Sequence, residues 1–346
     1  MRLLVTGATG FVGGWIVDRA VAAEHRVRVL VRDGEAARQR LLAGVEILVG
    51  HLTDGVLLDR ALAGVDVLVH AAAAYQYGHA VGTQQRTDNP AVARAVLDAA
   101  RRAATAHVID VSSAIVFAPH PDGPRRGVTD VDSPLWTESD RRSGDPYLSS
   151  KVLAYRDTQA ARAAGLPVSS IHPGMVLGPR DRVPGTSGAF LLGFLRERLF
   201  PATFMPWIDV RDLADVVLAV AQREPGGRYL VSRDWIPLRD VAASVDRVTG
   251  ARRRRVFLPP ALVLALARMN DLTGGRANPR LAPRPSLEYL LRNRGHIDNS
   301  TGTAALGRPF RAVDETVRDT IAWWAANGLV SPAEAGSAAV REPDNL

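Results

Sequence analysis

The chain has 346 residues, of which 47% are hydrophobic and 23% charged, and its formal net charge is +7. This composition is typical of a globular protein with a sizeable core, and the length suits a large α/β domain with a smaller appendage. The absence of cysteine excludes disulfides and cysteine-ligated metals, and it fits a cytoplasmic protein.

Strand-like and helix-like patterns alternate through residues 1–175. Residues 2–7 are a short apolar run that ends in glycine, so we expect a strand there and no signal peptide before it. Further strands are expected at 26–31, 45–50, 66–71, 107–113 and 168–174, with helices at 11–23, 55–63, roughly 90–104 and 146–164. This order predicts an α/β fold, a Rossmann-type doubly wound parallel sheet that binds its ligand at the carboxyl ends of the strands.

After residue 175 the alternation loosens, with helices expected at 188–199 and 207–223 and a strand at 227–232. We assign a dinucleotide-binding domain to residues 1–175 plus about 208–230, a smaller, mostly helical substrate-binding region to about 176–207 and 231–330, and a polar tail to 331–346. No apolar run reaches the length of a membrane span, and the stretch 257–267 is expected to be a buried helix.

Positive charge gathers in residues 251–311, which contain 12 arginines against 3 acidic residues and include the run Arg252–Arg255. Such a run can mark a nucleic-acid contact. Neither interleaved aromatic residues nor a nucleic-acid-binding module accompanies it here. We therefore expect a solvated face and no nucleic-acid partner.

The segment TGATGFVG places glycines at positions 7, 10 and 13, between the first strand and the first helix. Gly7 allows a tight turn, Gly10 lets the backbone approach a pyrophosphate, and Gly13 lets the helix pack close to the strand. The free N–H groups at the start of the helix then face the phosphates. The pattern predicts a dinucleotide site.

The end of the second strand distinguishes between the two dinucleotides. An acidic residue there hydrogen-bonds a ribose 2′-hydroxyl, whereas an arginine pairs with a 2′-phosphate. Here Arg32 comes first and Asp33 follows. Arg32, with Arg38 as a candidate helper, favours NADP(H), and Asp33 leaves NAD(H) open.

Lys151 is the only lysine in the chain, and it stands four residues after Tyr147. We expect Asp145 to cap the helix that contains both, with Pro146 at its first position. Residues i and i+4 share a helix face, so the ammonium favours the phenolate and makes Tyr147 a usable general acid and base. The compact ammonium can also donate to a ribose hydroxyl, which the planar fork of an arginine does less well.

Together these motifs resemble those of the extended short-chain dehydrogenase/reductase family, also called the NAD-dependent epimerase/dehydratase family. The likeness runs along nearly the whole chain and includes the alanine-rich segment HAAAA at 70–74 and HPGMVLGP at 172–179. Ser112 and Ser113 both end the strand at 107–113, and the resemblance selects Ser113, the serine before alanine. The implied catalytic residues are Ser113, Tyr147 and Lys151. The implied cofactor-binding residues are Thr6, Gly7, Thr9, Gly10, Phe11, Val12, Gly13, Arg32, His51, Leu52, Ala71, Ala72, Ala73, Lys151, Pro173 and Val176.

Within the family, the chain is most similar to the dihydroflavonol-reductase and 3β-hydroxysteroid-dehydrogenase group of carbonyl reductases. The implied reaction is the reversible reduction of a ketone or aldehyde with NADP(H), on an apolar small molecule. One departure is His51, which stands where the family has an adenine-contacting aspartate. No metal is expected at His51, because partner ligands at metal spacing are missing.

Candidate residues for the substrate wall are Tyr75, Tyr77, Phe117, Trp136, Met175 and Trp207. Two alternatives stay open: a nucleotide-sugar epimerase with tightly bound NAD, and a non-catalytic, dinucleotide-sensing binding protein. A dehydratase is less favoured, because Ala114 and Ile115 stand where its acidic pair would follow. The resemblance also suggests a homodimer.

Overall fold

The computed structural model describes residues 1–73, 82–122, 126–137, 146–272 and 295–340, together with Leu287 and Leu291. Its main sheet has seven parallel strands in the order β11-β7-β5-β4-β1-β2-β3. The strands are β1 (Arg2–Thr6), β2 (Arg26–Val31), β3 (Glu46–Val49), β4 (Val67–His70), β5 (His107–Val111), β7 (Val168–Pro173) and β11 (Arg228–Val231). The strand order reverses between β1 and β4, so the predicted Rossmann-type sheet is confirmed.

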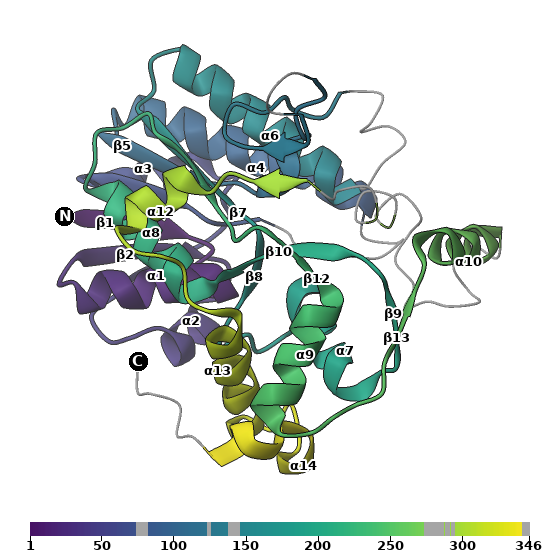
Figure 1. Ribbon diagram of the computed structural model, residues 1–346. Helices are drawn as coiled ribbons and strands as arrows, with labels where there is room; N and C mark the ends of the chain where they lie inside the picture. Colours follow the sequence, from purple (N-terminus) through teal and green to yellow (C-terminus); the bar gives the residue numbers. More distant parts are fainter. Residues whose placement is uncertain are drawn as a thin grey trace.

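Helices cover both faces of the main sheet (Figure 1). One face carries α1 (Phe11–Ala22), α2 (Gly34–Arg40), α8 (Val210–Ala221) and α12 (Ser300–Leu306), and the other carries α3 (Gly55–Leu62), α4 (Gly82–Arg102) and α6 (Pro146–Ala163). Side chains alternate along β1, so Leu3 and Val5 join the first core and Leu4 joins the second. All three are fully buried, as in the central strand of a two-sided sheet.

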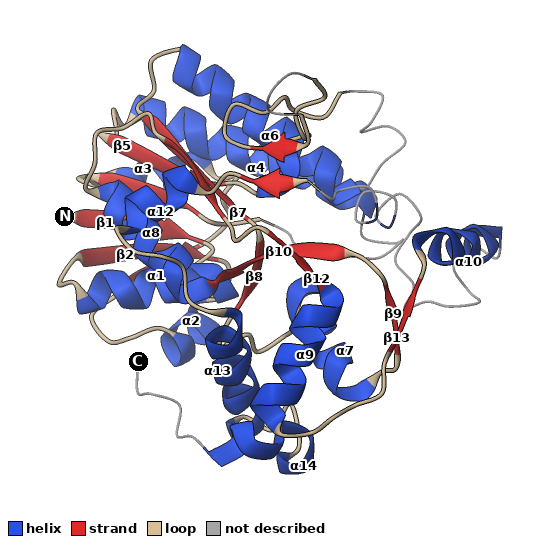
Figure 2. Cartoon of the chain, viewed as in Figure 1, coloured by secondary structure: helices blue, strands red, loops and turns tan. Residues whose placement is uncertain are grey.

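A second region is built around two small sheets and a separate core. Its strands are β8 (Met175–Leu177), β10 (Phe204–Asp209) and β12 (Trp235–Pro237), with the pair β9 (Leu199–Pro201) and β13 (Val256–Leu258). Its helices are α7 (Thr186–Arg196), α9 (Leu238–Thr249), α10 (Pro260–Leu272), α13 (Val313–Ala326) and α14 (Pro332–Ala335). Figure 2 shows the β9–β13 pair far from the main sheet, with α10 beyond it.

Short elements also occur in the described ranges. β6 (Val128–Thr129) pairs with β14 (His296–Ile297), and 3₁₀ helices span Ala114–Val116 and Gly336–Val340. α12 comes from a stretch that we expected in the substrate region, but it packs on α8 and β11. Its Ala305 is buried in the core of the main sheet, which explains this position.

The prediction of a polar tail is wrong for residues 331–340. This stretch begins with a capping box between Ser331 and Glu334 and continues as a short helix. Ala335 and Ala338 are buried in the core of the second region, where the chain lies against α9 and α13. Small alanine side chains allow this close packing, but their weak hydropathy hides it in the sequence.

The run Arg252–Arg255 is only half solvated, so the expectation of a uniformly solvated face is also wrong. Arg255 has a side chain that is 4% exposed, and it pairs with Asp246 at 2.9 Å. Arg253 donates a hydrogen bond to the carbonyl oxygen of Glu334 at 2.7 Å. The other two arginines are exposed. The backbone is extended here, so alternate side chains point inward and outward.

Helix α10 was expected to be buried, but much of its surface is open. Val263 and Ala267 are buried, whereas Leu262, Leu266 and Met269 are 47%, 42% and 65% exposed. The apolar surface of α10 is therefore broader than its contact with the rest of the described chain. None of the helices in the described ranges has both the length and the hydropathy needed to cross a membrane.

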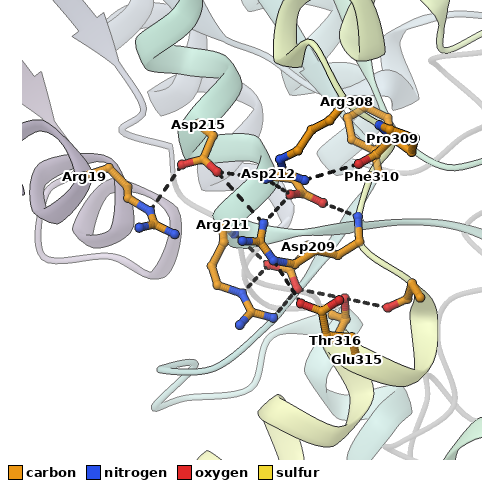
Figure 3. Close-up of polar contacts among 12 residues, drawn as sticks. Arg19, Asp209, Arg211, Asp212, Asp215, Arg308, Pro309, Phe310, Glu315 and Thr316 are labelled. Carbon is orange, nitrogen blue, oxygen red and sulfur yellow. Dashed lines mark hydrogen bonds and ion pairs between the residues drawn. The ribbon is translucent and has the colours of Figure 1, made fainter. Parts of the chain in front are cut away.

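Ion pairs tie the segment before α13 to α8 (Figure 3). Asp212 lies on α8 with a side chain that is 0% exposed. It accepts a hydrogen bond from the backbone N–H of Arg311 at 2.6 Å and also pairs with the guanidinium of that residue. Arg308 reaches the same carboxylate at 2.8 Å. One buried charge is thus compensated by two arginines from a distant part of the sequence.

A second pair of contacts extends this network to α13. Arg211 pairs with Asp209, the N-cap residue of α8, at 2.8 Å and with Asp319 of α13 at 2.7 Å. Burial opposes the charge of Arg211, but the hydrogen bonds and charges of the two aspartates hold the pKa of Arg211 above its ordinary value. Thr316 of α13 donates to the same Asp209 oxygen, Oδ2, at 2.8 Å. The network therefore fixes α13 and the second region relative to the main sheet.

We predict that Asp212→Ala lowers the free energy of unfolding by about 3 kcal/mol, because it leaves partly buried guanidinium groups without their shared carboxylate. The measurement is chemical denaturation followed by circular dichroism. Asp157→Ala is the control, since the Arg94 side chain that pairs with Asp157 is 64% exposed and such a pair contributes less than about 1 kcal/mol. Equal losses in the two variants would contradict the prediction.

Candidate active site

A cleft of about 2190 Å³ runs along the carboxyl ends of the main-sheet strands and on into the second region. At one end it is lined by the glycine-rich turn after β1, in the middle by the ends of β4, β5 and β7, and at the other end by α7, β9 and α10. This is the position that the reversed strand order of an open α/β sheet provides for a ligand.

The glycine turn is shaped by close backbone contacts. Gly7 has a φ of +75°, a conformation that side chains disfavour, and a Cβ there would meet the Ala71 carbonyl oxygen at 2.8 Å. A Cβ on Gly13 would lie 2.2 Å from the Gly7 carbonyl oxygen. Gly10 precedes α1 and carries no side chain to cap it. The first N–H groups of α1 are therefore open to a phosphate group.

Two arginines line the same end of the cleft. Arg32 follows β2, and Arg40 lies at the end of α2, where its guanidinium donates to the Thr9 carbonyl oxygen at 3.2 Å. Asp33 is engaged elsewhere, since its carboxylate caps α2 by accepting the Ala36 N–H at 3.0 Å. Arg38, the helper expected from the sequence, is not among the cleft residues. Its side chain is 65% exposed and lies 3.8 Å from Glu35.

Nearly all of the predicted cofactor residues line the cleft. Those found there are Gly7, Thr9, Gly10, Phe11, Val12, Gly13, Arg32, His51, Leu52, Ala71, Ala72, Ala73, Lys151, Pro173 and Val176. Thr6 is the exception, because it is fully buried beneath the turn. Its hydroxyl lies 2.9 Å from His70 Nδ1 and accepts the Ala72 N–H at 3.3 Å, so Thr6 joins β1 to the end of β4.

Tyr147 and Lys151 lie one turn apart at the start of α6, and both line the cleft with Ser113. The Lys151 Nζ is 6.0 Å from the centre of the Tyr147 ring. Ser113 follows β5 and caps a 3₁₀ turn through the Ile115 N–H at 3.3 Å. The structure thus brings together the three residues predicted to be catalytic. Asp145, the predicted cap of α6, lies outside the described residues.

Lys151 is 8% exposed. Burial lowers the pKa of Lys151, and the charge of Asp110 on β5 raises it in opposition. Burial also lowers the pKa of His70 to about 4, with a smaller contribution from the nearby Lys151 charge. His70 is therefore neutral at physiological pH, and the ammonium lies above a floor of buried polar groups.

The predicted substrate residues divide into three groups. Phe117 and Met175 line the cleft. Trp136 packs beside the 3₁₀ turn and donates to the Ile115 carbonyl oxygen at 2.9 Å, outside the cleft lining. Trp207 is 3% exposed and belongs to the core of the second region, because it faces the inner side of β10. Tyr75 and Tyr77 lie outside the described residues.

Past Met175, the cleft is lined mainly by apolar side chains of the second region. These are Phe190 of α7, Leu199 and Phe200 of β9, Met205 of β10, Leu258 of β13, and Val263, Leu266 and Met269 of α10. We call this part of the cleft its apolar arm. Leu266 and Met269 are two of the exposed residues of α10, so part of the apolar surface of α10 faces this arm. The arm is suited to apolar ligand groups.

Comparison with known proteins identifies the family. The sequence profile of the NAD dependent epimerase/dehydratase family matches residues 3–232. The chain belongs to this family. Its members bind NAD(P), and they include both reductases and epimerases, so the protein is an enzyme of the extended short-chain dehydrogenase/reductase kind.

Two curated relatives and one solved structure illustrate the range of the family. Sterol demethylase protein B of Methylococcus capsulatus is 29% identical, over 95% of this chain and 100% of the relative. A putative dihydroflavonol 4-reductase of Synechocystis is 26% identical, over 94% and 95%. The UDP-glucose 4-epimerase of Thermus thermophilus, solved with NAD, is 21% identical with a TM-score of 0.72, over 95% of this chain and 100% of that chain. At this identity the last match shows the shared fold alone.

Three residues of this family member were not selected from the sequence as site residues. Asn89 of α4 lines the cleft, and its amide donates to the Ser150 hydroxyl at 3.2 Å. Ser150 in turn donates to the Tyr147 carbonyl oxygen at 2.8 Å, so α4 supports the first turn of α6. Arg40 stands eight positions after Arg32, and only the path of α2 brings the two together.

We predict that Gly13→Ala lowers the free energy of unfolding by about 3 kcal/mol and weakens dinucleotide binding, because the added methyl group forces α1 away from the β1 turn. Gly14→Ala is a matched control, since its Cβ would meet only the Ala8 carbonyl oxygen at 3.5 Å. Alanine should stabilise that position by about 0.5 kcal/mol or more, as it does in helix interiors. Denaturation and dinucleotide titration measure both variants, and a shift of the same sign in both would refute the packing argument.

Proposed function

We propose that the protein is an NADP(H)-dependent oxidoreductase that reduces the ketone or aldehyde group of an apolar small molecule, reversibly, to an alcohol. The observation that carries the proposal is the order of groups along the cleft. The glycine turn comes first, then Ser113, Tyr147 and Lys151, and then the apolar arm. A carbonyl at the mouth of that arm would meet all three polar side chains while its apolar part filled the arm.

The three residues have complementary tasks in this reaction. A bound nicotinamide dinucleotide supplies or accepts the hydride. The Tyr147 hydroxyl donates a proton to the carbonyl oxygen as negative charge develops there. The Ser113 hydroxyl donates a hydrogen bond to the same oxygen, which stabilises the alkoxide-like transition state. The Lys151 ammonium favours the phenolate that Tyr147 becomes, and it can hold a ribose hydroxyl.

The preference for NADP(H) is supported by the charges at the adenosine end of the cleft. Arg32 and Arg40 both line it, so two guanidinium groups are available for a 2′-phosphate. Asp33 is the residue that would favour NAD(H), but its carboxylate accepts a hydrogen bond from the Ala36 N–H at the start of α2. A carboxylate used in this way is less free to accept a hydrogen bond from a ribose 2′-hydroxyl.

An apolar substrate is supported by the arm and by the two curated relatives. Their names refer to a sterol and to a dihydroflavonol. Charged groups that could bind a nucleotide diphosphate, as an epimerase requires, are also present. However, Arg180 pairs with Asp18 and lies over the Trp15 ring at 4.9 Å, and Arg182 lies over Trp323 at 5.7 Å. We therefore favour the reductase.

We predict that Tyr147→Phe lowers kcat for carbonyl reduction by about 10² to 10⁴, since general acid catalysis typically contributes this factor. The assay follows NADPH oxidation over a panel of apolar ketones, aldehydes and steroids, and fluorescence titration measures NADPH binding separately. The variant should bind NADPH as the wild type does. Tyr155→Phe is the control, because Tyr155 lies on the same helix but is buried in the core.

A Tyr147→Phe enzyme that reduces its substrate at near wild-type rate would overturn the mechanism. NAD retained through purification, with activity on nucleotide sugars, would favour the epimerase. NADPH binding without turnover of any carbonyl would favour a dinucleotide sensor.

We predict that Arg40→Ser raises the KM for NADPH by about tenfold to a hundredfold, because a charge-assisted hydrogen bond to phosphate contributes about 1.5–3 kcal/mol. The KM for NADH, which has no 2′-phosphate, should change little. Arg38→Ser is the matched control and should leave both values unchanged. If Arg40→Ser affected both dinucleotides equally, its role would lie in supporting the Thr9 loop and not in binding the phosphate.

A further inference from the structure

The site depends on an ammonium that the fold has largely removed from water. Lys151 is 8% exposed, and burial of a charged group without a partner is strongly unfavourable. A buried lysine commonly responds by losing its proton. A neutral Lys151 could neither favour the Tyr147 phenolate nor attract a developing negative charge. The floor of the cleft therefore has to supply a group that keeps Lys151 charged.

Beneath α6, a row of polar residues crosses four central strands of the main sheet. In the strand register, Thr6 of β1 pairs with His70 of β4, His70 with Asp110 of β5, and Asp110 with Ser170 of β7. Register partners in a parallel sheet point to the same face. Their neighbours Leu4, Leu68, Val108 and Val168 share the core formed with α3, α4 and α6, so the polar row faces these helices.

Asp110 is held in this row by α6 itself. The hydroxyl of Thr158 donates to its carboxylate at 2.9 Å. Thr158 stands two helical turns after Lys151, and residues seven apart lie on the same helix face. The carboxylate therefore lies under the face of α6 that carries Lys151. Asp110 is itself 8% exposed, so water screens the charge between the two groups only weakly.

Among the described residues of the polar row and of α6 near Lys151, Asp110 is the acidic residue, and the other titratable groups are tyrosines and histidines. Tyr147 and Tyr155 lie on α6, His70 on β4 and His172 on β7. Burial lowers the pKa of His172 to about 3 and that of His70 to about 4, so both are neutral at pH 7. Burial raises the pKa of Asp110, while the Lys151 charge and the Thr158 hydrogen bond act in the opposite direction.

We propose that Asp110 is a positioning residue whose negative charge keeps Lys151 protonated beside Tyr147, with Thr158 holding the carboxylate in place. The catalytic consequence rests on the proposed function, whereas the charge state of Lys151 can be measured without any reaction. Asp110 touches neither the substrate nor the cofactor positions, since it is absent from the residues that line the cleft. It acts through Lys151 alone.

Because Lys151 is the only lysine, its protonation can be followed directly. Protein grown with ¹³C-lysine gives one side-chain Cε resonance, whose chemical shift reports the ammonium as pH is raised. Asp110→Asn keeps the shape and removes the charge, so Lys151 should lose its proton at a lower pH than in the wild type. Asp157→Asn removes a carboxylate from the outer side of α6 and should leave the titration unchanged.

Two variants of Thr158 test the role of Asp110 if Asp110→Asn does not fold. Thr158→Val leaves the carboxylate without its hydrogen bond and should shift the Lys151 titration in the same direction by a smaller amount. Thr158→Ser retains the hydroxyl and should restore the wild-type titration. An unchanged Lys151 titration in Asp110→Asn, or in Thr158→Val where the first variant is unfolded, would overturn the proposal.

The kinetic readout is the pH dependence of kcat/KM for carbonyl reduction. Without the negative charge of Asp110, Lys151 should lose its proton at lower pH. Tyr147 should also lose its proton at lower pH, because the positive charge beside it is no longer offset. Both changes move the alkaline limb of the profile to lower pH. At pH 7 we expect kcat/KM to fall on the order of tenfold, as one partly screened charge interaction implies. A uniform fall at every pH would mean that Asp110 is merely structural.

If no carbonyl compound is turned over by the wild type, the proposed function fails while the resonance titration still decides the role of Asp110. If the wild type is an active reductase and the titration is unchanged, only the role of Asp110 fails. The reductase function and the role of Asp110 are therefore tested by different measurements.

Discussion

The geometry of the cleft depends on the buried ion pairs between α8 and the segment before α13. One wall of the cleft belongs to the main sheet, and the other belongs to a region with its own core. Asp212 on α8 pairs with Arg308 (Figure 3) and with Arg311, and Arg211 on α8 pairs with Asp319 of α13. The charge of Asp212 is compensated only when the segment with Arg308 and Arg311 lies against α8, whereas Arg211 also has Asp209 beside it at 2.8 Å. The network therefore helps to hold the two walls of the cleft together.

The features that were predictable from the sequence are those that depend on local spacing. The turn with Gly7 and Gly13 follows directly from the close approach of α1 to β1, where a Cβ would meet a carbonyl oxygen at 2.2 Å. Tyr147 and Lys151 share a helix face because they are four residues apart. Alternating apolar runs were sufficient to predict the strands of the main sheet along the chain and the helices α1, α3, α4, α6 and α8, but not α2 or α12.

Features that depend on contacts between distant segments were not predictable. Trp207 is a large aromatic residue of the kind that often lines a substrate pocket, but it points to the inward side of β10 and is buried in the core of the second region. Arg253 and Arg255 sit in a uniformly basic run, yet an extended backbone turns them toward partners from other elements. The polar row under Lys151 is also invisible in the sequence, because its members come from four strands that only the sheet register aligns.

The position of β11 has a consequence for how the chain folds. This strand pairs with β7 but is separated from it by much of the second region, and α12 covers it from still later in the sequence. During synthesis, β7 therefore presents an unpaired edge until β11 has emerged, after β8, α7, β9 and β10 of the second region. The main sheet therefore cannot be completed before the first part of the second region has been synthesised. Chains truncated before β11 should therefore aggregate through the open edge of β7.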